Sequence, residues 1–265
     1  NIGISMGIAG TDVAKDASDM VLQDDNFANI VNAVEEGRKI YTNIRNFVRY
    51  QVSTNVAAVA LLLLANVIFQ WPLPLTPTQI LVINILMDGP PAVALGVERM
   101  HANVMDRPPR PVDESLPNLL DLLLIFYLGA VMVIGTLIVY YLALENGTDY
   151  AQTMCFSVFI FYQLFNVMNC RSNEDSVFKL GIFSNRAIYL AIMFSICLLM
   201  LAVQGAEITI PLTSFQIGEL LSTIPLKAND WVIIVLVAST VFMVEEFRKL
   251  LRTTGVFRVR TNKRT

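Results

Sequence analysis

Charged side chains are scarce in this chain of 265 residues: Asp, Glu, Lys and Arg together make up 15% of it. An average soluble domain carries about 25% charged residues and about 45–50% apolar ones. Here the apolar share reaches 55%, and the mean hydropathy is +0.57. This composition excludes an ordinary soluble domain and indicates that most of the chain is dissolved in lipid.

Side chains that bind transition metals or form disulfides are also few. The sequence has one histidine, His101, and three cysteines. Because a zinc site needs about four Cys, His or carboxylate ligands close together, this composition argues against one. Cys155 and Cys197 fall inside apolar segments and Cys170 at the end of one. We therefore expect free thiols rather than disulfides.

Long apolar runs, in contrast, are abundant. Six segments are long enough to be membrane helices, at about 51–70, 77–96, 122–144, 151–169, 187–204 and 229–247. They predict an all-α polytopic membrane protein with six transmembrane helices in residues 51–247. A polar segment, 1–30, precedes them, and a basic cytoplasmic tail, 248–265, follows them.

Basic residues are distributed unevenly over this pattern. If residue 1 lies in the cytoplasm and the chain crosses six times, the external loops are 71–76, 145–150 and 205–228, and Lys227 is their only basic residue. All the other Lys and Arg residues, of 19 in total, then lie toward the cytoplasm. This positive-inside asymmetry predicts that both termini are cytoplasmic.

Residues 1–30 show a strand–helix–strand pattern. An alternating stretch at 2–6 and a second apolar stretch at 20–22 predict two short strands. Thr11 is placed to cap a helix over residues 12–18. Because so small a fragment cannot bury a core of its own, we expect it to complete a larger α/β domain.

A helical pattern begins at Phe27 and continues, without a proline, into the first apolar segment. It predicts one helix of about forty residues, near 60 Å long at 1.5 Å per residue. Residues 31–50 would form a cytoplasmic stalk and the remainder a membrane span. Such a helix would link a soluble domain mechanically to the membrane.

The second apolar segment contains polar residues in its middle. Asn84 and Asp88 lie four apart, and Gly89-Pro90-Pro91 follows directly. A carboxylate near the bilayer centre costs roughly 2.5–3.5 kcal/mol on insertion scales, so such residues commonly mark ion pathways. Residues four apart share one helix face, and their oxygens suit a hard cation such as Ca²⁺. The alternative is a buried polar pair that joins two helices.

Two stretches resemble the P-type cation-transporting ATPases. Residues 2–36, IGISMGIAGTDVAKDASDMVLQDDNFANIVNAVEE, resemble the end of the phosphorylation domain of that family. Residues 83–98, INILMDGPPAVALGVE, resemble the sixth membrane helix of its calcium-transporting branch, most closely the secretory-pathway type that transports calcium and manganese. The long helix resembles the fifth membrane helix with its stalk, and the six segments match the fifth to tenth helices. The resemblance covers about residues 1–252.

The resemblance implies that residues 1–30 are the C-terminal fragment of a phosphorylation domain. The phosphorylated Asp, the nucleotide-binding domain, the actuator domain and the first four membrane helices would lie outside this chain and be its partners, together with the lipid bilayer. No nucleic acid is implied as a partner. The resemblance places no catalytic or cofactor-binding residue here, so whether the chain alone is an enzyme stays open. ATP and Mg²⁺ would act only in the full-length pump, with Ca²⁺ as the transported ion.

The resemblance also assigns ligands. Asn84 and Asp88 would be the main metal ligands, with Asn55 and Gln163 as secondary ones. Pumps that carry two calcium ions have a Glu where this chain has Ala58, and another where it has Gln163. Because two neutral residues cannot offset a second divalent charge in a low-dielectric site, we predict one cation per ATP. Packing between helices is the alternative role for the two secondary residues.

Two further alternatives stay open. Mn²⁺, like Ca²⁺, seeks oxygen ligands, although Val93 stands where the secretory-pathway pumps carry a Gln implicated in manganese selectivity. The chain could instead be a non-catalytic membrane fragment, either a passive leak or a partner of an intact pump. The pump interpretation favours the plasma membrane, with a secretory-pathway membrane as the alternative.

Overall fold

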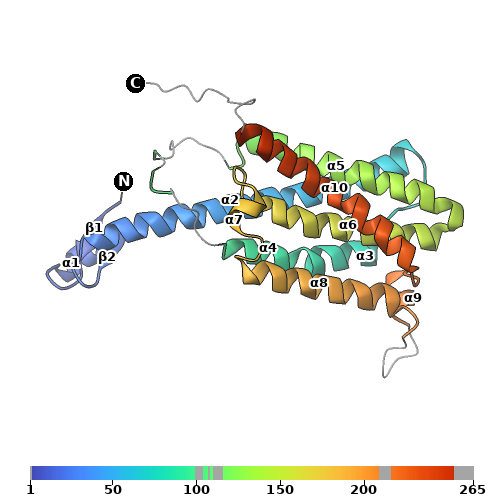
Figure 1. Ribbon diagram of the computed structural model, residues 1–265. Helices are drawn as coiled ribbons and strands as arrows, with labels where there is room; N and C mark the ends of the chain where they lie inside the picture. The colour runs from blue at the N-terminus through green and yellow to red at the C-terminus, as the bar shows by residue number, and fades with distance from the viewer. Residues whose placement is uncertain (1, 99–103, 107, 110–115, 209–215, 254–265) are drawn as a thin grey trace. The chain divides into compact units, whose positions relative to one another are not determined.

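The chain divides into two compact units, residues 1–42 with 100–111 and residues 43–99 with 112–265. The structure, a computed structural model, describes residues 2–98, 104–106, 108–109, 116–208 and 216–253 (Figure 1). His101 and the predicted tail beyond residue 253 lie outside the described residues.

The first unit contains a small parallel β–α–β element. Strand β1, Ile4–Met6, pairs in parallel with β2, Met20–Leu22. Helix α1, Asp12–Asp16, connects them and is shorter than the predicted span of 12–18. As predicted, the Thr11 hydroxyl caps this helix by accepting a 3.3 Å hydrogen bond from the N–H of Ala14.

Helix α2, Ala28–Leu62, continues directly into a π-helical segment, η1, Leu63–Ile68. The two together form a helix of 41 residues where the sequence pattern predicts about forty. Residues 28–42 of it belong to the first unit and the others to the second. At its start the Asn26 side chain accepts a 3.0 Å hydrogen bond from the N–H of Ala28, which satisfies one free donor of the first turn.

The second unit is helical throughout its described elements. These are α3 (Pro77–Val82), η2 (Ile83–Met87), α4 (Gly89–Gly96), α5 (Leu119–Ala143), η3 (Leu144–Asn146), α6 (Thr148–Cys170), α7 (Val177–Leu180), α8 (Arg186–Gln204), α9 (Ile217–Leu221) and α10 (Ala228–Thr253). Reciprocal capping boxes fix two of the starts, Thr76 with Gln79 at α3 and Asn118 with Asp121 at α5.

Within the described part of the chain, five helices are long and apolar enough to cross a membrane: Ala28–Ile68, Pro77–Gly96, Leu119–Asn146, Thr148–Cys170 and Arg186–Gln204. This confirms the prediction of an α-helical polytopic membrane protein. The sixth predicted span, 229–247, is helical as part of α10 but is not one of these five. The sixth crossing therefore stays a prediction.

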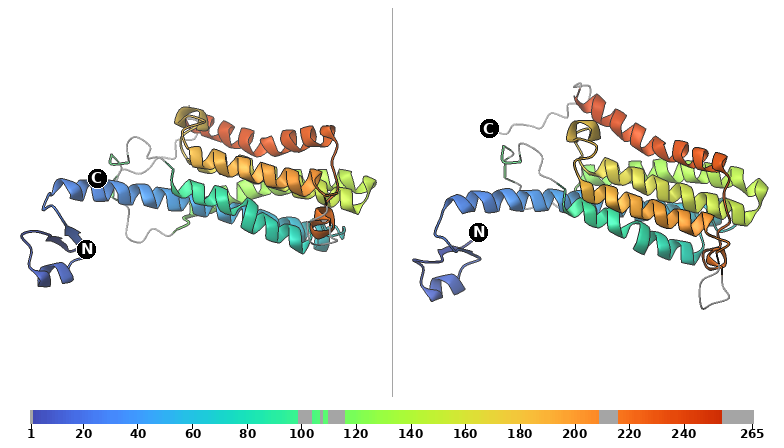
Figure 2. Two further views of the ribbon diagram at one scale, coloured as in Figure 1. Left: turned by 90° about the horizontal axis from the view of Figure 1, so that it is seen from below. Right: turned by 60° about the horizontal axis from the view of Figure 1, so that its bottom comes forward.

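Helix α6 is the central helix of the second unit. It packs against α5 on one side and α10 on another, and it is buried along nearly its whole length. Figures 1 and 2 show α5, α6 and α10 lying together, with α4 against α8 on the other side of α6. Apolar side chains of α6, such as Phe156 and Phe159, form the middle of the core.

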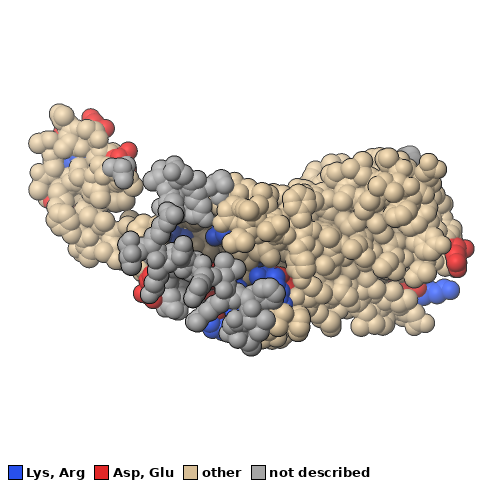
Figure 3. Space-filling model, turned by 90° about the horizontal axis from the view of Figure 1, so that it is seen from above, with Lys and Arg blue, Asp and Glu red and all other residues tan. Residues whose placement is uncertain are grey.

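The surface of the second unit has the charge distribution of a membrane-embedded body. Figure 3 shows charged side chains near its two ends and a long stretch between them that is almost free of charge on that face. Many large apolar side chains are exposed on this unit, among them Leu123, Ile134 and Leu236. The three cysteines are free thiols, as predicted.

Candidate cation site

The carboxylate of Asp88 is the centre of the candidate site, and its residue is completely buried. Its Oδ1 accepts a 2.7 Å hydrogen bond from the Tyr50 hydroxyl, and its Oδ2 accepts a 3.1 Å hydrogen bond from the Thr54 hydroxyl. Both donors lie on α2, four residues apart and therefore on one face of that helix. Both oxygens of the carboxylate are thus attached to the long helix.

The helix is irregular at Asp88: a π-helical turn ends just before it, and a new α-helix begins just after it. Because η2 is π-helical, the N–H of Asp88 donates to the carbonyl of Ile83 (2.9 Å) rather than to that of Asn84. Pro90 and Pro91 lack an N–H and occupy the first turn of α4, where no donor is needed. The irregular turn therefore lies before Asp88, and Gly89, Pro90 and Pro91 begin a regular helix after it. Single π-helical turns are frequent at functional sites.

Asn84 and Asp88 do not share one environment in this structure. Asn84, within η2, is exposed on the surface of the second unit, whereas Asp88 is buried. The prediction that the two side chains meet at one point rested on α-helical spacing. That spacing does not hold here, because the turn Ile83–Met87 is π-helical.

The two secondary candidates also differ from each other. Asn55 is exposed on α2, directly after Thr54. Gln163 on α6 is buried, and its Oε1 has no hydrogen-bond partner among the residues that the structure describes. Leaving a buried polar atom unpaired costs about 1–3 kcal/mol, so this oxygen is chemically available to a ligand or a water molecule.

Two further buried amides of α6, Asn166 and Asn169, serve packing between helices. Asn166 donates a 2.9 Å hydrogen bond to the hydroxyl of Ser53 on α2. Asn169 donates a 3.0 Å hydrogen bond to the carbonyl of Val241 on α10. These bonds join the central helix to a neighbour on each side, which is the bridging role that amides commonly take in membrane bundles.

Among the described residues, no group of three or more His, Cys, Asp or Glu side chains is placed to hold a metal ion. Ca²⁺ takes about 6–8 oxygen ligands. Asp88 and the candidate amides alone therefore offer too few oxygens to complete a cation shell.

A second buried polar cluster lies at the opposite end of α4. The guanidinium of Arg171 binds the carboxylate of Glu98 through two hydrogen bonds, Nε to Oε2 (3.0 Å) and Nη2 to Oε1 (2.9 Å). Neither residue is more than 2% exposed. Neither this pair nor Tyr50 and Thr54 were predicted from the sequence. The only local signal for Tyr50 and Thr54 was their spacing: they are polar, four residues apart and directly before Asn55.

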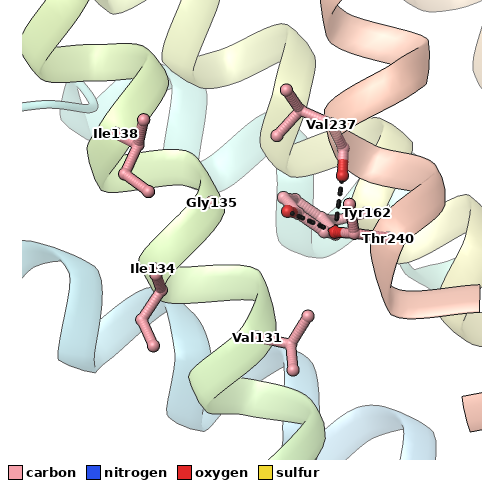
Figure 4. Close-up of a pocket in the computed structure, with 7 residues that line it drawn as sticks. All are labelled: Val131, Ile134, Gly135, Ile138, Tyr162, Val237 and Thr240. Carbon is pink, nitrogen blue, oxygen red and sulfur yellow. Dashed lines mark hydrogen bonds between the residues drawn. The ribbon is translucent and has the colours of Figure 1, made fainter. Parts of the chain in front are cut away.

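A shallow apolar pocket of about 350 Å³ lies between α5, α6 and α10 (Figure 4). Its polar groups are the hydroxyls of Tyr162 and Thr240, which are 3.0 Å apart. Gly135 on α5 gives the Tyr162 hydroxyl its space, because a methyl group on Gly135 would overlap it. The pocket has no charged or amide side chain in its lining and is not the cation site.

In the first unit, a carboxylate holds the turn that follows β1. Asp25 accepts hydrogen bonds from the backbone N–H groups of Ile8 (2.9 Å) and Ala9 (2.8 Å). The bond from Ile8 is the main reason why the pKa of Asp25 lies below its usual range.

Comparisons with known proteins agree on one family. The family described as "Cation transporting ATPase, C-terminus" matches residues 72–251. "Calcium-transporting ATPase 1" of Schizosaccharomyces pombe is 41% identical over 265 residues, which is 99% of this chain and 28% of that protein. "Calcium-transporting ATPase type 2C member 2" of Rattus norvegicus is 43% identical over 253 residues, 94% of this chain and 26% of that protein.

A human relative, "Calcium-transporting ATPase type 2C member 1", is 45% identical over 198 residues, covering 74% of this chain and 21% of the relative. The chain thus spans about a quarter of the length of the curated relatives that it matches.

Proposed function

Because this chain belongs to the P-type cation-transporting ATPases, in the calcium-pump branch, we propose that it forms the membrane transport portion of an ATP-driven calcium-exporting pump. The observation that carries the proposal is the buried carboxylate of Asp88, which lies at a break in a membrane helix. Broken helices and intramembrane carboxylates are the usual elements of ion sites in transport proteins.

The partners of this portion are the missing N-terminal part of the pump and the bilayer. Asn55 and Asn84 are exposed beside exposed apolar residues of their own helices, Val59 and Ile85. An amide that faces lipid is costly, so protein rather than lipid covers these two side chains in the complete pump. We infer that membrane helices outside this chain cover them and supply the remaining cation ligands.

The long helix would carry movement to the site. Helix α2 provides both hydrogen-bond donors to Asp88 and contains residues of both compact units. A displacement of α2 along its axis would therefore move Tyr50 and Thr54 relative to the carboxylate. In the full-length pump, ATP hydrolysis in the missing domains would drive that displacement, and one divalent cation would leave the cytoplasm per ATP.

The orientation we propose follows from the basic residues. Lys227 alone would face the outside, and both termini would be cytoplasmic, in the plasma membrane or a secretory-pathway membrane.

The proposal is tested with Asp88→Asn in the complete pump. The substitution keeps the shape of the side chain but removes the charge that a divalent ion requires, so cation-dependent phosphorylation by ATP should be abolished. Asp121→Asn is the matched control, because Asp121 is also buried but pairs with Arg45 at 2.8 Å. Phosphorylation of Asp88→Asn at an unchanged calcium concentration would show that Asp88 is structural.

A further inference from the structure

Glu98, Arg171 and Asn185 form a buried polar cluster that we call the clamp. In addition to the paired bonds between Arg171 and Glu98, Asn185 Nδ2 donates to Glu98 Oε2 at 2.9 Å. The same amide donates to the carbonyl of Ala94, in the last turn of α4, at 3.2 Å. All three side chains are at most 5% exposed, so they interact without competition from water.

The hydrogen-bonding capacity of Arg171 is fully used. Its Nη1 donates to the carbonyls of Gly181 (3.2 Å) and Ile182 (3.1 Å), and its Nη2 also donates to the hydroxyl of Ser184. Together with the two bonds to Glu98, these contacts satisfy all five N–H donors. A buried ion pair is stable only when its remaining polar atoms are satisfied in this way.

The clamp joins the ends of three helices. Glu98 follows α4, Arg171 is the C-cap of α6, and Asn185 is the N-cap of α8. Helix α2 adds two amide contacts to the same region: Asn43 donates to the Glu98 carbonyl (3.1 Å) and Asn46 to the Arg171 carbonyl (2.9 Å). The far end of α4 is therefore fixed to three neighbouring helices.

The near end of α4 carries Asp88. The carbonyl of Asp88 accepts a 3.1 Å hydrogen bond from Ala92, so its backbone is part of the first turn of α4. Glu98 lies ten residues further on, or about 15 Å along a helix axis. Because Pro90 and Pro91 have no N–H, neither donates a hydrogen bond from the first turn of α4 back to η2. Helix α4 thus connects the clamp, at its C-terminal end, to the Asp88 carboxylate, at its N-terminal end.

We propose that the clamp positions Asp88 for cation binding: by fixing the far end of α4, it fixes the backbone that carries the carboxylate at the near end and thereby sets the cation affinity of the site. The proposal rests on the proposed function, in which Asp88 is a cation ligand. Arg171 and Glu98 are positioning residues, because neither touches the carboxylate. The planar, five-donor guanidinium suits this role, since a lysine could not make the paired bonds to Glu98 and the carbonyl bonds together.

The test compares two substitutions of buried, ion-paired acids in the complete pump. Glu98→Gln removes the negative charge of the clamp and leaves the buried guanidinium of Arg171 without its counter-ion. Glu245→Gln removes a fully buried acid that pairs with Arg248, at 2.8 Å, within α10. The readouts are the Ca²⁺ concentration for half-maximal phosphorylation, the maximal phosphorylation level and the thermal unfolding midpoint.

Glu98→Gln should raise the half-saturating Ca²⁺ concentration by about fivefold or more, the lower range for coupling between separate sites. The maximal level should remain near that of the unmodified pump. Glu245→Gln should lower the unfolding midpoint without this change in affinity. An unchanged half-saturating concentration in Glu98→Gln, or an equal rise in both variants, would overturn the proposal.

Asn185→Ser keeps the proposal testable if Glu98→Gln does not fold. Serine still caps α8 but cannot reach Glu98, so a smaller rise in the same direction is expected, and no rise would refute the clamp. Asp88→Asn separates the two proposals. If it keeps a normal cation response, the proposed function fails; if it loses that response while the clamp variants behave normally, only the clamp is refuted.

Discussion

Tyr50 and Asp88 are joined by a 2.7 Å hydrogen bond across 38 residues of sequence, between the long helix α2 and the broken helix that follows it. The bond is completely buried, and Thr54 holds the second carboxylate oxygen. A cation that binds Asp88 therefore meets a carboxylate whose oxygens already accept hydrogen bonds from two hydroxyl groups.

Removing the Tyr50 hydroxyl should tighten cation binding. Tyr50→Phe deletes a bond that stabilises the cation-free carboxylate, and hydrogen bonds to charged groups contribute about 1.5–3 kcal/mol. The half-saturating Ca²⁺ concentration for phosphorylation should fall by up to about tenfold, which corresponds to about 1.4 kcal/mol. A weaker affinity would show instead that the hydroxyl holds the carboxylate in the geometry that the cation needs.

Thr54→Val is the matched control for that experiment. The Thr54 hydroxyl has one proton but three acceptors within reach: Asp88 Oδ2 (3.1 Å) and the carbonyls of Tyr50 (3.2 Å) and Gln51 (3.0 Å). Its bond to the carboxylate is therefore shared and weaker. The same assay should show a shift in the same direction but smaller than that of Tyr50→Phe.

The complete pump should carry one cation per ATP. A second divalent ion would need more negative charge near the first, because Coulomb repulsion is strong at low dielectric constant. The positions available for it here are Ala58 and Gln163, of which the latter offers a neutral, unpaired oxygen. Direct binding measurements should saturate at one Ca²⁺ per phosphorylation site, with a Hill coefficient near unity. Two bound ions, or clear positive cooperativity, would contradict this prediction.

Gly135→Ala should destabilise the packing of α5 against α6. The added methyl group would overlap the Tyr162 hydroxyl, and overpacking of this kind costs about 1–3 kcal/mol. The thermal unfolding midpoint in detergent should fall, and adding Tyr162→Phe should restore part of the loss by making room. Gly37→Ala is the control, because nothing lies within 4 Å of that position and alanine favours a helix by about 1 kcal/mol. A Gly135→Ala midpoint that does not fall would exclude close packing at Tyr162.

The turn held by Asp25 should loosen at low pH. The pKa of Asp25 is lowered in the folded state from an ordinary 3.8. Its stabilising effect is therefore fully present above about pH 4 and is lost as the pH falls through the lowered value. Hydrogen exchange at Ile8 and Ala9, corrected for the intrinsic pH dependence, should accelerate below that range. In Asp25→Asn the corrected rates should be fast at every pH; unchanged protection in that variant would disprove the role of the charge.

Hydropathy was sufficient to locate five of the six predicted membrane helices, because burial in lipid requires long apolar runs whatever their partners. The predicted segment 77–96 and the helix Pro77–Gly96 have the same bounds. The prediction failed at finer detail within that segment. The π-helical turn at Ile83–Met87 departs from α-helical hydrogen bonding, and spacing rules for an α-helix do not contain such a turn.

The contacts that support the candidate site could not be found from sequence. Glu98 and Arg171 are 73 residues apart, and each resembles an ordinary charged residue at the cytoplasmic end of a helix. Only the packing of α4 between α6 and α8 turns them into a buried pair. Asp88 itself was identifiable, because a carboxylate within an apolar run is conspicuous on its own.

The central position of α6 has a consequence for assembly during synthesis. The carbonyl of Asn169, in its last turn, accepts a 3.1 Å hydrogen bond from Arg49 on α2 and another of 3.1 Å from Lys249 on α10. Helix α2 is made before α6, and α10 is made after it. The end of α6 is therefore fully hydrogen-bonded only after α10 has left the ribosome. Until α10 is in place, the side of α6 that α10 covers in the folded protein faces the membrane or the insertion machinery.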